Sequence, residues 1–195
     1  AGGFMVGMQA TLDVSGSKNN IMLLGAGSVE SVERREGGMD TAGIVAASID
    51  GLRTRAGIEG VSPEIHIQMP IEVDGENRLV LIRGVRSEGY LVHDQVRISH
   101  GHAPRNGRNE LLIGKLTVQT IGYDTPEEVI GKTVVLDEDE YTITGVLEAD
   151  GGIIEGEMWT SLTDLQITTQ RDTLSCVVVA LDTAKASDLE AFAAS

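Results

Sequence analysis

The sequence predicts an α+β fold, in which a discontinuous α/β subdomain carries a second, β-rich subdomain inserted into it. Two observations lead to this prediction. Strand and helix patterns alternate towards both ends of the chain, whereas short strand patterns separated by turn residues fill its middle. The expected boundaries place residues 1–84 and 166–195 in the α/β subdomain and residues 85–165 in the β-rich subdomain.

The first part of the chain carries the strand and helix patterns of the α/β subdomain. Residues 4–14 place apolar side chains near helical spacing, and residues 21–24 form a short apolar strand pattern. After a loop rich in Gly and Ser, residues 42–56 predict a helix, because an apolar stripe recurs at helical spacing and a glycine follows it. The result is a strand, a loop and a helix in that order.

A strand hairpin is expected next. Apolar and polar residues alternate strictly over residues 65–73, which is typical of a half-buried strand. Residues 74–77, with the sequence Asp-Gly-Glu-Asn, predict a turn, and residues 79–82 predict the returning strand.

The middle of the chain predicts the β-rich subdomain. A short helix is expected over residues 115–121, where a glycine follows the last apolar position. A last strand and helix follow, over residues 174–181 and 187–194, and we expect the chain to continue into a further strand beyond them. The other strands expected here cover residues 96–99, 110–113, 133–136 and 141–147.

Composition excludes several classes of function. Of the 195 residues 41% are hydrophobic but only 3% are aromatic, so a core must consist mainly of aliphatic side chains. The net charge of −15 leaves no basic surface for nucleic acid or for an anionic bilayer, whereas a cationic partner stays open. No window approaches the about twenty apolar residues of a membrane span, and the chain is expected to be part of a longer protein.

No catalytic motif stands out. The sequence lacks a Walker motif, a Gly-x-Ser-x-Gly elbow and a His-Glu-x-x-His helix, so we expect a protein that is not an enzyme and that needs no cofactor or metal. The single cysteine, Cys176, lies in a valine-rich strand pattern and is expected to be a buried hydrophobe. The acidic run over residues 137–140 is expected to be a solvated turn, because it lacks the spacing of a calcium loop.

Three histidines allow a metal site to be considered. His100 and His102 would face the same side of an extended strand, and His93 could add a ligand. The other interpretation is that all three are ordinary loop histidines, because no second Cys or His cluster completes a site.

Two adjacent isoleucines are the candidate for a binding surface. Ile153 and Ile154 lie in the glycine-flanked segment Asp-Gly-Gly-Ile-Ile-Glu-Gly. An apolar pair exposed on a loop suits contact with a partner, whereas one or both side chains could instead be buried beneath the β-rich subdomain. Trp159 is expected in the core, beside a helix capped by Ser161.

The order of short motifs in the middle of the chain resembles a known family. Five elements follow one another. They are an extended segment ending in glycine, a strand ending in Gly with a short helix, a Gly-Lys-Thr-Val strand, a Thr-Gly-Val strand and a strand entering a helix. They cover residues 98–101, 110–114, 131–136, 141–147 and 158–162. In this order they are similar to the extracytoplasmic core domain of MacB/FtsX-type ABC transporter permeases. His102 departs from the pattern, because many members have Arg after this glycine.

The resemblance implies a fold, a place and a function. It implies a Porter-like α/β subdomain with an inserted Sabre-like subdomain, and it makes residues 1–15 an extension of a preceding transmembrane helix. It further implies a non-catalytic domain outside the cytoplasmic membrane of a bacterium or archaeon, which transmits ATP-driven motion or docks partners. The implied partners are a cytoplasmic ATP-binding subunit, an envelope protein and, in the full-length protein, a second copy. The alternative is a stand-alone ligand-binding or adhesion module on a bacterial surface.

Overall fold

The chain forms two compact units. The computed structural model describes residues 8–12, 20–25, 54–55, 58–171 and 174–180. The first unit is made of Ala1–Glu64, Arg86–Asp94 and Asp172–Ser195, and the second of Ile65–Val85 and Gln95–Arg171. This division assigns residues 65–85 to the second unit, whereas the sequence predicts a boundary after residue 84. The subdomain boundaries themselves stay a prediction.

The first unit contains an antiparallel sheet. Its strands follow the order β1, β2, β12 and then the first residues of β5, and a two-stranded hairpin of β3 and β4 accompanies it. Val92 of a short helix, α4, belongs to a buried apolar cluster with Cys176, Val178 and Ala180 of β12. The bounds are β1 Met8–Leu12, β2 Asn20–Gly25, β3 Thr54–Arg55, β4 Ile58–Glu59, β5 Val61–Val73, α4 Glu88–Val92 and β12 Cys176–Ala180.

The prediction of a helix over residues 4–14 is wrong for the part that the structure describes. Met8–Leu12 form the strand β1, because their backbone pairs in antiparallel register with β2. The strand expected over residues 21–24 is confirmed as part of β2. Within the helix expected over residues 42–56, Thr54–Arg55 instead form the strand β3, which pairs with β4, so the prediction is wrong there. The rest of that helix lies outside the described residues, as does the helix expected over residues 187–194.

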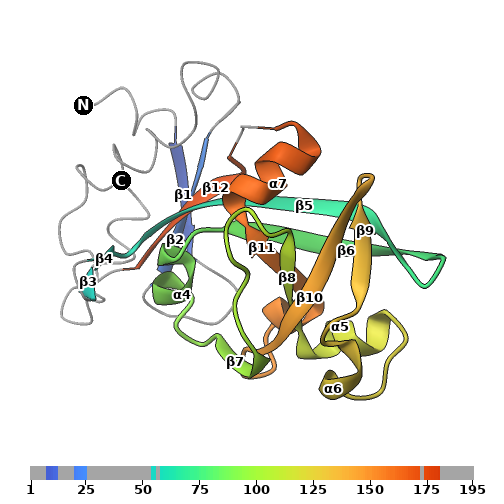
Figure 1. The fold of residues 1–195 in the computed structure, drawn as a ribbon. Coiled ribbons are helices and arrows are strands. Elements are labelled where there is room, and N and C mark those ends of the chain that lie inside the picture. The colour runs from blue at the N-terminus through green and yellow to red at the C-terminus, as the bar shows by residue number, and fades with distance from the viewer. Residues whose placement is uncertain (1–7, 13–19, 26–53, 56–57, 172–173, 181–195) are drawn as a thin grey trace. The chain divides into compact units, whose positions relative to one another are not determined.

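The second unit is a closed ring of six strands. The hydrogen-bonded order runs β5, β6, β11, β8, β10 and β9, and β9 pairs in turn with β5, which closes the ring (Figure 1). A further strand, β7, pairs with the far end of β10. The bounds are β6 Glu76–Val85, β7 Arg97–Gly101, β8 Glu110–Gly114, β9 Thr133–Leu136, β10 Asp139–Glu148 and β11 Glu157–Ser161.

Short helices connect the strands of the ring. Within α6 a capping box joins Thr125 and Glu128, and in α7 the Ser161 side chain accepts a hydrogen bond from the Asp164 N–H (3.4 Å), which confirms the predicted cap. Gly84 of β6 lies against Leu162 and Leu165 of α7. The helices are α5 Lys115–Thr120, α6 Pro126–Val129, the 3-10 helix η1 Ile153–Gly156 and α7 Leu162–Thr169.

Aliphatic side chains make up most of the buried core of the second unit. Trp159 is fully buried, as the sequence predicts. The hairpin prediction is also confirmed: Asp74 and Gly75 both have positive φ angles and join β5 to β6 in a two-residue turn. None of the helices in the described part of the chain is long and apolar enough to span a membrane. Other fully buried residues of this core include Ile82, Leu111, Leu112, Ile113, Leu136, Ile143 and Leu147.

Candidate functional site

The two isoleucines of the candidate binding surface have opposite environments. Both lie in η1, between β10 and β11. Ile154 is fully buried, so its side chain cannot meet a partner in this conformation. Ile153 is 65% exposed, which is unusual for a large apolar side chain in a helical turn that is otherwise packed.

The turn that carries Ile153 is firmly anchored. The carboxylate of Glu155 is buried and accepts a hydrogen bond from the Ala149 N–H (2.8 Å). The Thr117 hydroxyl of α5 lies within hydrogen-bonding distance of the Glu155 carbonyl (3.4 Å) and of the Glu157 carbonyl (2.9 Å). A Cβ atom on Gly114 would meet the Glu155 carbonyl oxygen at 2.0 Å, so only glycine fits there. Ile153 is therefore held on a fixed backbone.

Charged residues that form ion pairs with one another lie close to this turn. Arg97 binds Asp150 (2.7 Å) and Glu148 (3.1 Å), and Lys115 lies 3.7 Å from Glu148. The pKa of Arg97 is raised, chiefly by its hydrogen bond to Asp150. We call Ile153 together with these four charged residues the η1 surface. One apolar side chain among polar neighbours is a surface composition that suits contact with a protein rather than catalysis.

Apolar exposure extends to α5, which packs on η1, and to α6 and β7, which are linked to η1 through α5 and β10. Helix α5 packs against both η1 and α6, and β7 pairs with β10. Each of these elements exposes one large apolar side chain: Ile98 in β7, Leu116 in α5 and Ile130 at the end of α6. Single exposed apolar residues are ordinary, but four on elements packed together favour a binding region.

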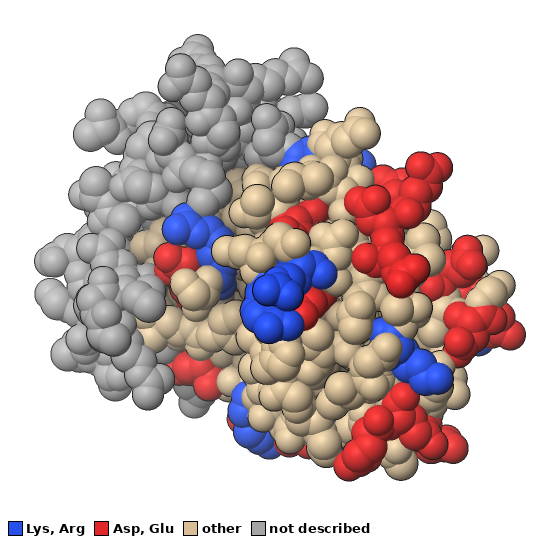
Figure 2. All heavy atoms as spheres, viewed as in Figure 1, with Lys and Arg blue, Asp and Glu red and all other residues tan. Residues whose placement is uncertain are grey.

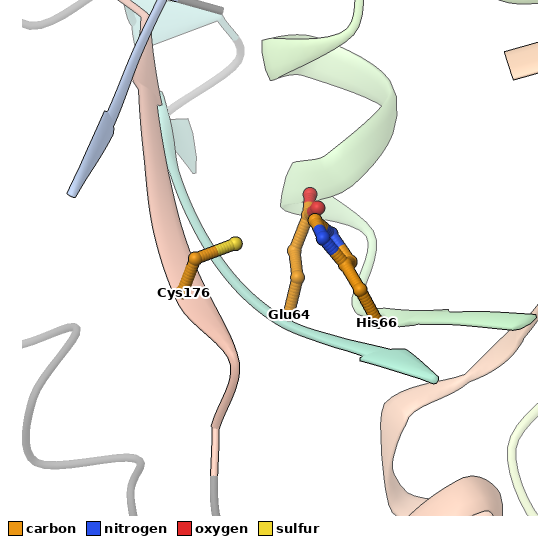
Figure 3. Close-up of side chains that lie close together, drawn as sticks. All are labelled: Glu64, His66 and Cys176. Carbon is orange, nitrogen blue, oxygen red and sulfur yellow. The ribbon is translucent and has the colours of Figure 1, made fainter. Parts of the chain in front are cut away.

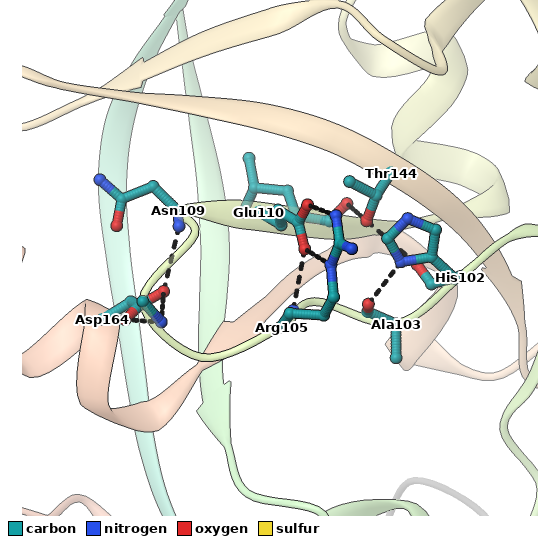
Figure 4. A network of polar contacts seen from close by, with 9 residues as sticks. His102, Ala103, Arg105, Asn109, Glu110, Thr144 and Asp164 are labelled. Carbon is teal, nitrogen blue, oxygen red and sulfur yellow. Dashed lines mark hydrogen bonds and ion pairs between the residues drawn. The ribbon is translucent and has the colours of Figure 1, made fainter.

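A polar network fixes the loop between β7 and β8 (Figure 4). The Arg105 side chain binds both carboxylate oxygens of Glu110 (3.0 and 2.7 Å), and its hydrogen bond lowers the pKa of Glu110. The buried Asp164 carboxylate accepts hydrogen bonds from the N–H groups of Gly107 (2.9 Å) and Asn109 (3.1 Å). Asp164 thus lies in the first turn of α7 and holds the loop at the same time, a role that the sequence does not reveal.

Replacing Asp164 is expected to release this loop. In Asp164→Asn one acceptor becomes an NH₂ group facing two backbone donors, so we expect a loss of about 1–3 kcal/mol in local stability. Amide hydrogen exchange at Gly107 and Asn109 should accelerate, whereas Asp124→Asn at an exposed position should leave it unchanged. Equal protection of these two amides in both variants would show that the carboxylate does not hold the loop.

The second unit also buries an ion pair. The Arg83 guanidinium makes two hydrogen bonds to the Glu157 carboxylate (2.7 and 2.9 Å), and both side chains are almost fully buried. The indole N–H of Trp159 donates to the same carboxylate (3.1 Å), and Arg83 lies 5.5 Å from the centre of the indole ring. Nothing in the strand patterns signals this pair, because Arg83 and Glu157 lie 74 residues apart in the sequence.

The three histidines of the metal hypothesis have separate partners. His93 is buried and its Nε2 lies 2.8 Å from the Glu64 carboxylate. His100 lies 3.1 Å from the Glu127 carboxylate, and the His102 Nδ1 lies 2.8 Å from the Ala103 carbonyl. These contacts favour the interpretation as ordinary histidines over a shared metal site.

Another group of potential ligands involves Glu64, His66 and Cys176 (Figure 3). Glu64 of β5 and Cys176 of β12 are directly opposite each other in the sheet, and both are buried. The Glu64 carboxylate already accepts a hydrogen bond from the Ser62 hydroxyl (2.8 Å) and contacts His93. A carboxylate with these two partners is satisfied without a metal, so the group is explained by packing.

Acidic side chains gather on the second unit. Figure 2 shows them over the part that holds the β5–β6 turn, the β9–β10 turn and α6. Asp137, Glu138 and Glu140 of the predicted solvated turn are exposed. Asp139 differs, because it is half-buried and accepts a hydrogen bond from the Thr168 hydroxyl (2.7 Å).

Comparison with solved structures finds this fold in two transporter domains. The periplasmic region of MacB from Actinobacillus actinomycetemcomitans has a TM-score of 0.61 at 11% identity, over 89% of this chain and 82% of that one. The extracellular domain of the ABC-type transporter YknZ from Gram-positive bacteria has a TM-score of 0.58 at 18% identity, over 76% and 74%. No curated protein matches the chain.

Comparison with protein families agrees with the fold. The MacB-like periplasmic core domain matches residues 1–195, which is the whole chain. The resemblance drawn from the motif order is thereby confirmed. This chain belongs to the family of MacB-like periplasmic core domains, which are parts of ABC transporter permeases.

Proposed function

We propose that this chain is a non-catalytic extracytoplasmic domain that docks an envelope partner and transmits to it the motion of a permease driven by a cytoplasmic ATP-binding subunit. The observation that carries the proposal is Ile153, a large apolar side chain exposed on a turn in which the next two residues, Ile154 and Glu155, are buried. A fixed apolar anchor loses little entropy when it binds, which is the usual property of an interface hot spot.

The construction of the second unit supports transmission of motion. Its strands form a closed ring, and the η1 backbone is tied to α5 by the contacts of Thr117 and by the absence of space at Gly114. A rigid unit passes a displacement from one side to another without absorbing it. We further propose that the first unit corresponds to a Porter-like subdomain and the second to a Sabre-like one.

The family supports a placement for this domain. A MacB-like periplasmic core domain is part of a membrane-embedded permease, so we propose that the domain lies outside the cytoplasmic membrane of a bacterium or archaeon. The charges around Ile153 pair with one another, so a partner need not supply a matching net charge at this point. We therefore expect an apolar contact to dominate binding to the η1 surface.

Replacing Ile153 tests the docking role. In the full-length permease with its ATP-binding subunit, Ile153→Asp is expected to reduce transport or signalling at least about tenfold, because a charge replaces the apolar anchor. The basal ATPase rate of the permease with its ATP-binding subunit, measured in detergent without a partner, should stay unchanged. Both activities can be measured on one preparation.

A matched control is available on another helix. Ile167 of α7 is 70% exposed, so Ile167→Asp makes the same chemical change at the same exposure but away from η1. It should leave both transport and ATPase activity intact. Equal losses of transport in the two variants would contradict a specific role for Ile153.

A further inference from the structure

Among the described residues, one edge of strand β5 is unpaired over a short stretch of the second unit. Along its other edge β5 pairs with β6 from Ile65 to Val73. On the open side β12 pairs with β5 only up to Glu64, and β9 pairs with it only from Ile71. No described strand pairs with residues 66–70 on that side.

The register of the hairpin shows which backbone groups face this opening. Val73 and Glu76 flank the two-residue turn, so they form a hydrogen-bonded pair and the odd-numbered residues of β5 direct their backbone groups towards β6. The backbone groups of the even-numbered residues therefore point the other way. Gln68 offers an N–H and a C=O to the opening, and Pro70 offers a C=O.

A pocket lies along the same stretch. It has a volume of about 330 Å³ and is lined by the β5 segment from Ile67 to Pro70, by Asp137 of the β9–β10 turn and by the residues Thr169 and Arg171 at the end of α7. Ile67 and Met69 are only half-buried, although the neighbouring odd residues Ile65 and Ile71 are fully buried. The missing strand thus exposes apolar side chains as well as backbone groups.

The pocket carries one charge of each sign. Arg171 and Asp137 both line it, and neither side chain has an ion-pair partner among the described residues. An exposed cation without a carboxylate partner is notable in a chain whose net charge is −15. Arg171 suits an acidic group of a ligand and Asp137 suits a basic group, so the pocket complements a ligand in which an apolar group separates the two.

We propose that this open edge of β5 binds an extended peptide segment of a partner protein by strand addition. The segment pairs its backbone with Gln68 and Pro70 and places an apolar side chain on Ile67 and Met69. Its acidic and basic side chains face Arg171 and Asp137. This site, which we call the β5 edge, is separate in sequence and in elements from the η1 surface, and it does not depend on the function proposed for that surface.

Pro70 limits what the edge can bind. A proline on an edge strand removes a donor, which is a common protection against uncontrolled pairing between sheets. Gln68 and Pro70 together offer three backbone groups, and so short a stretch disfavours general aggregation through this edge. Selection must then come from the pocket, through the apolar contact and the two charges.

Binding of synthetic peptides to the 195-residue chain tests the proposal. The probe is a set of fluorescein-labelled heptapeptides with alternating valines and every combination of Glu, Lys and Thr between them. Saturable binding is expected for members that carry both a Glu and a Lys, measured by fluorescence anisotropy. Methylation of backbone nitrogens on one alternate set should abolish binding, whereas methylation of the other set should preserve it, because only one edge of an added strand faces β5.

Three variants complete the test. Gln68→Pro removes the outward N–H without removing a bond to β6, so binding should weaken about tenfold, whereas Gln68→Ala keeps the backbone donor and should bind as the wild type does. Arg171→Glu should shift the preference to peptides that carry two Lys residues. An unchanged tryptophan-fluorescence unfolding midpoint confirms that each variant is folded.

Three results would overturn the proposal. The first is that no member of the set saturates the wild-type chain. The second is that Gln68→Pro binds the peptides as tightly as the wild-type chain does and that both N-methylated peptides bind the wild-type chain as tightly as the unmethylated peptide does. The third is that sedimentation shows a dimer of the chain that Gln68→Pro dissociates, because the edge would then be occupied by a second copy rather than by a partner's peptide.

Discussion

Glu157→Gln is expected to lower the free energy of unfolding by about 3 kcal/mol or more, because it leaves the Arg83 guanidinium buried without its counter-charge. It also replaces a carboxylate oxygen that accepts hydrogen bonds from both Arg83 and the Trp159 indole. Urea unfolding followed by fluorescence measures the loss directly, since Trp159 is the one tryptophan of the sequence and lies beside the altered group.

An exposed ion pair provides the control for this experiment. Arg97→Gln breaks the contacts with Asp150 and Glu148 at the surface, and it should cost less than about 1 kcal/mol. The double variant Arg83→Met with Glu157→Leu should recover much of the stability lost in Glu157→Gln, because apolar side chains often replace a buried ion pair without loss. Similar midpoints for Glu157→Gln and Arg97→Gln would show that the buried pair is not an important source of stability.

Gly114→Ala is expected to be comparably severe, with a loss of about 3 kcal/mol. The added methyl group would lie 2.0 Å from the carbonyl oxygen of Glu155, and backbone atoms cannot move aside as the end of a side chain can. Because Glu155 belongs to η1, the substitution should also displace Ile153 and reduce partner docking. Thermal unfolding of the purified chain measures the first effect, and transport by the full-length permease measures the second.

A second glycine in the same region separates the two effects. Gly156 ends η1, and a Cβ atom there meets nothing within 4 Å. Gly156→Ala should therefore change the unfolding temperature little and leave transport intact. A Gly114→Ala protein that unfolds at the wild-type temperature would mean that η1 shifts freely, and the account of Ile153 as a fixed anchor would then fail.

The strands of the second unit were accessible to sequence reasoning because their patterns are local. The alternation over residues 65–73 and the returning strand pattern over residues 79–82 predict most of β5 and the middle of β6, and the structure confirms both strands. Residues 76 and 77, expected in the turn, belong to β6. Closure of the ring was not accessible in the same way. It depends on the pairing of Ile71 with Leu136. These residues are distant in the sequence, and no local pattern indicates that their strands pair.

The same difference explains the outcome at the candidate sites. Sequence patterns single out Ile153 and Ile154 through their flanking glycines, but only burial separates the exposed residue from the buried one. Asp164 and Glu157 act through partners far along the chain, so each looks like an ordinary charged residue in its own segment. The helical spacing of apolar residues over 4–14 predicts a helix, but residues 8–12 form a strand. Apolar periodicity over so short a window cannot outweigh strand pairing with β2.

The order of strands in the ring also has a consequence during synthesis. Strand β11, which ends at Ser161, lies between β6 and β8, although both of those strands leave the ribosome earlier. A nascent chain that stops before β11 lacks the strand that joins them and cannot complete the ring. The second unit therefore comes into existence only once nearly all of it has been made, and a truncated product exposes apolar strands that cellular proteases can recognise.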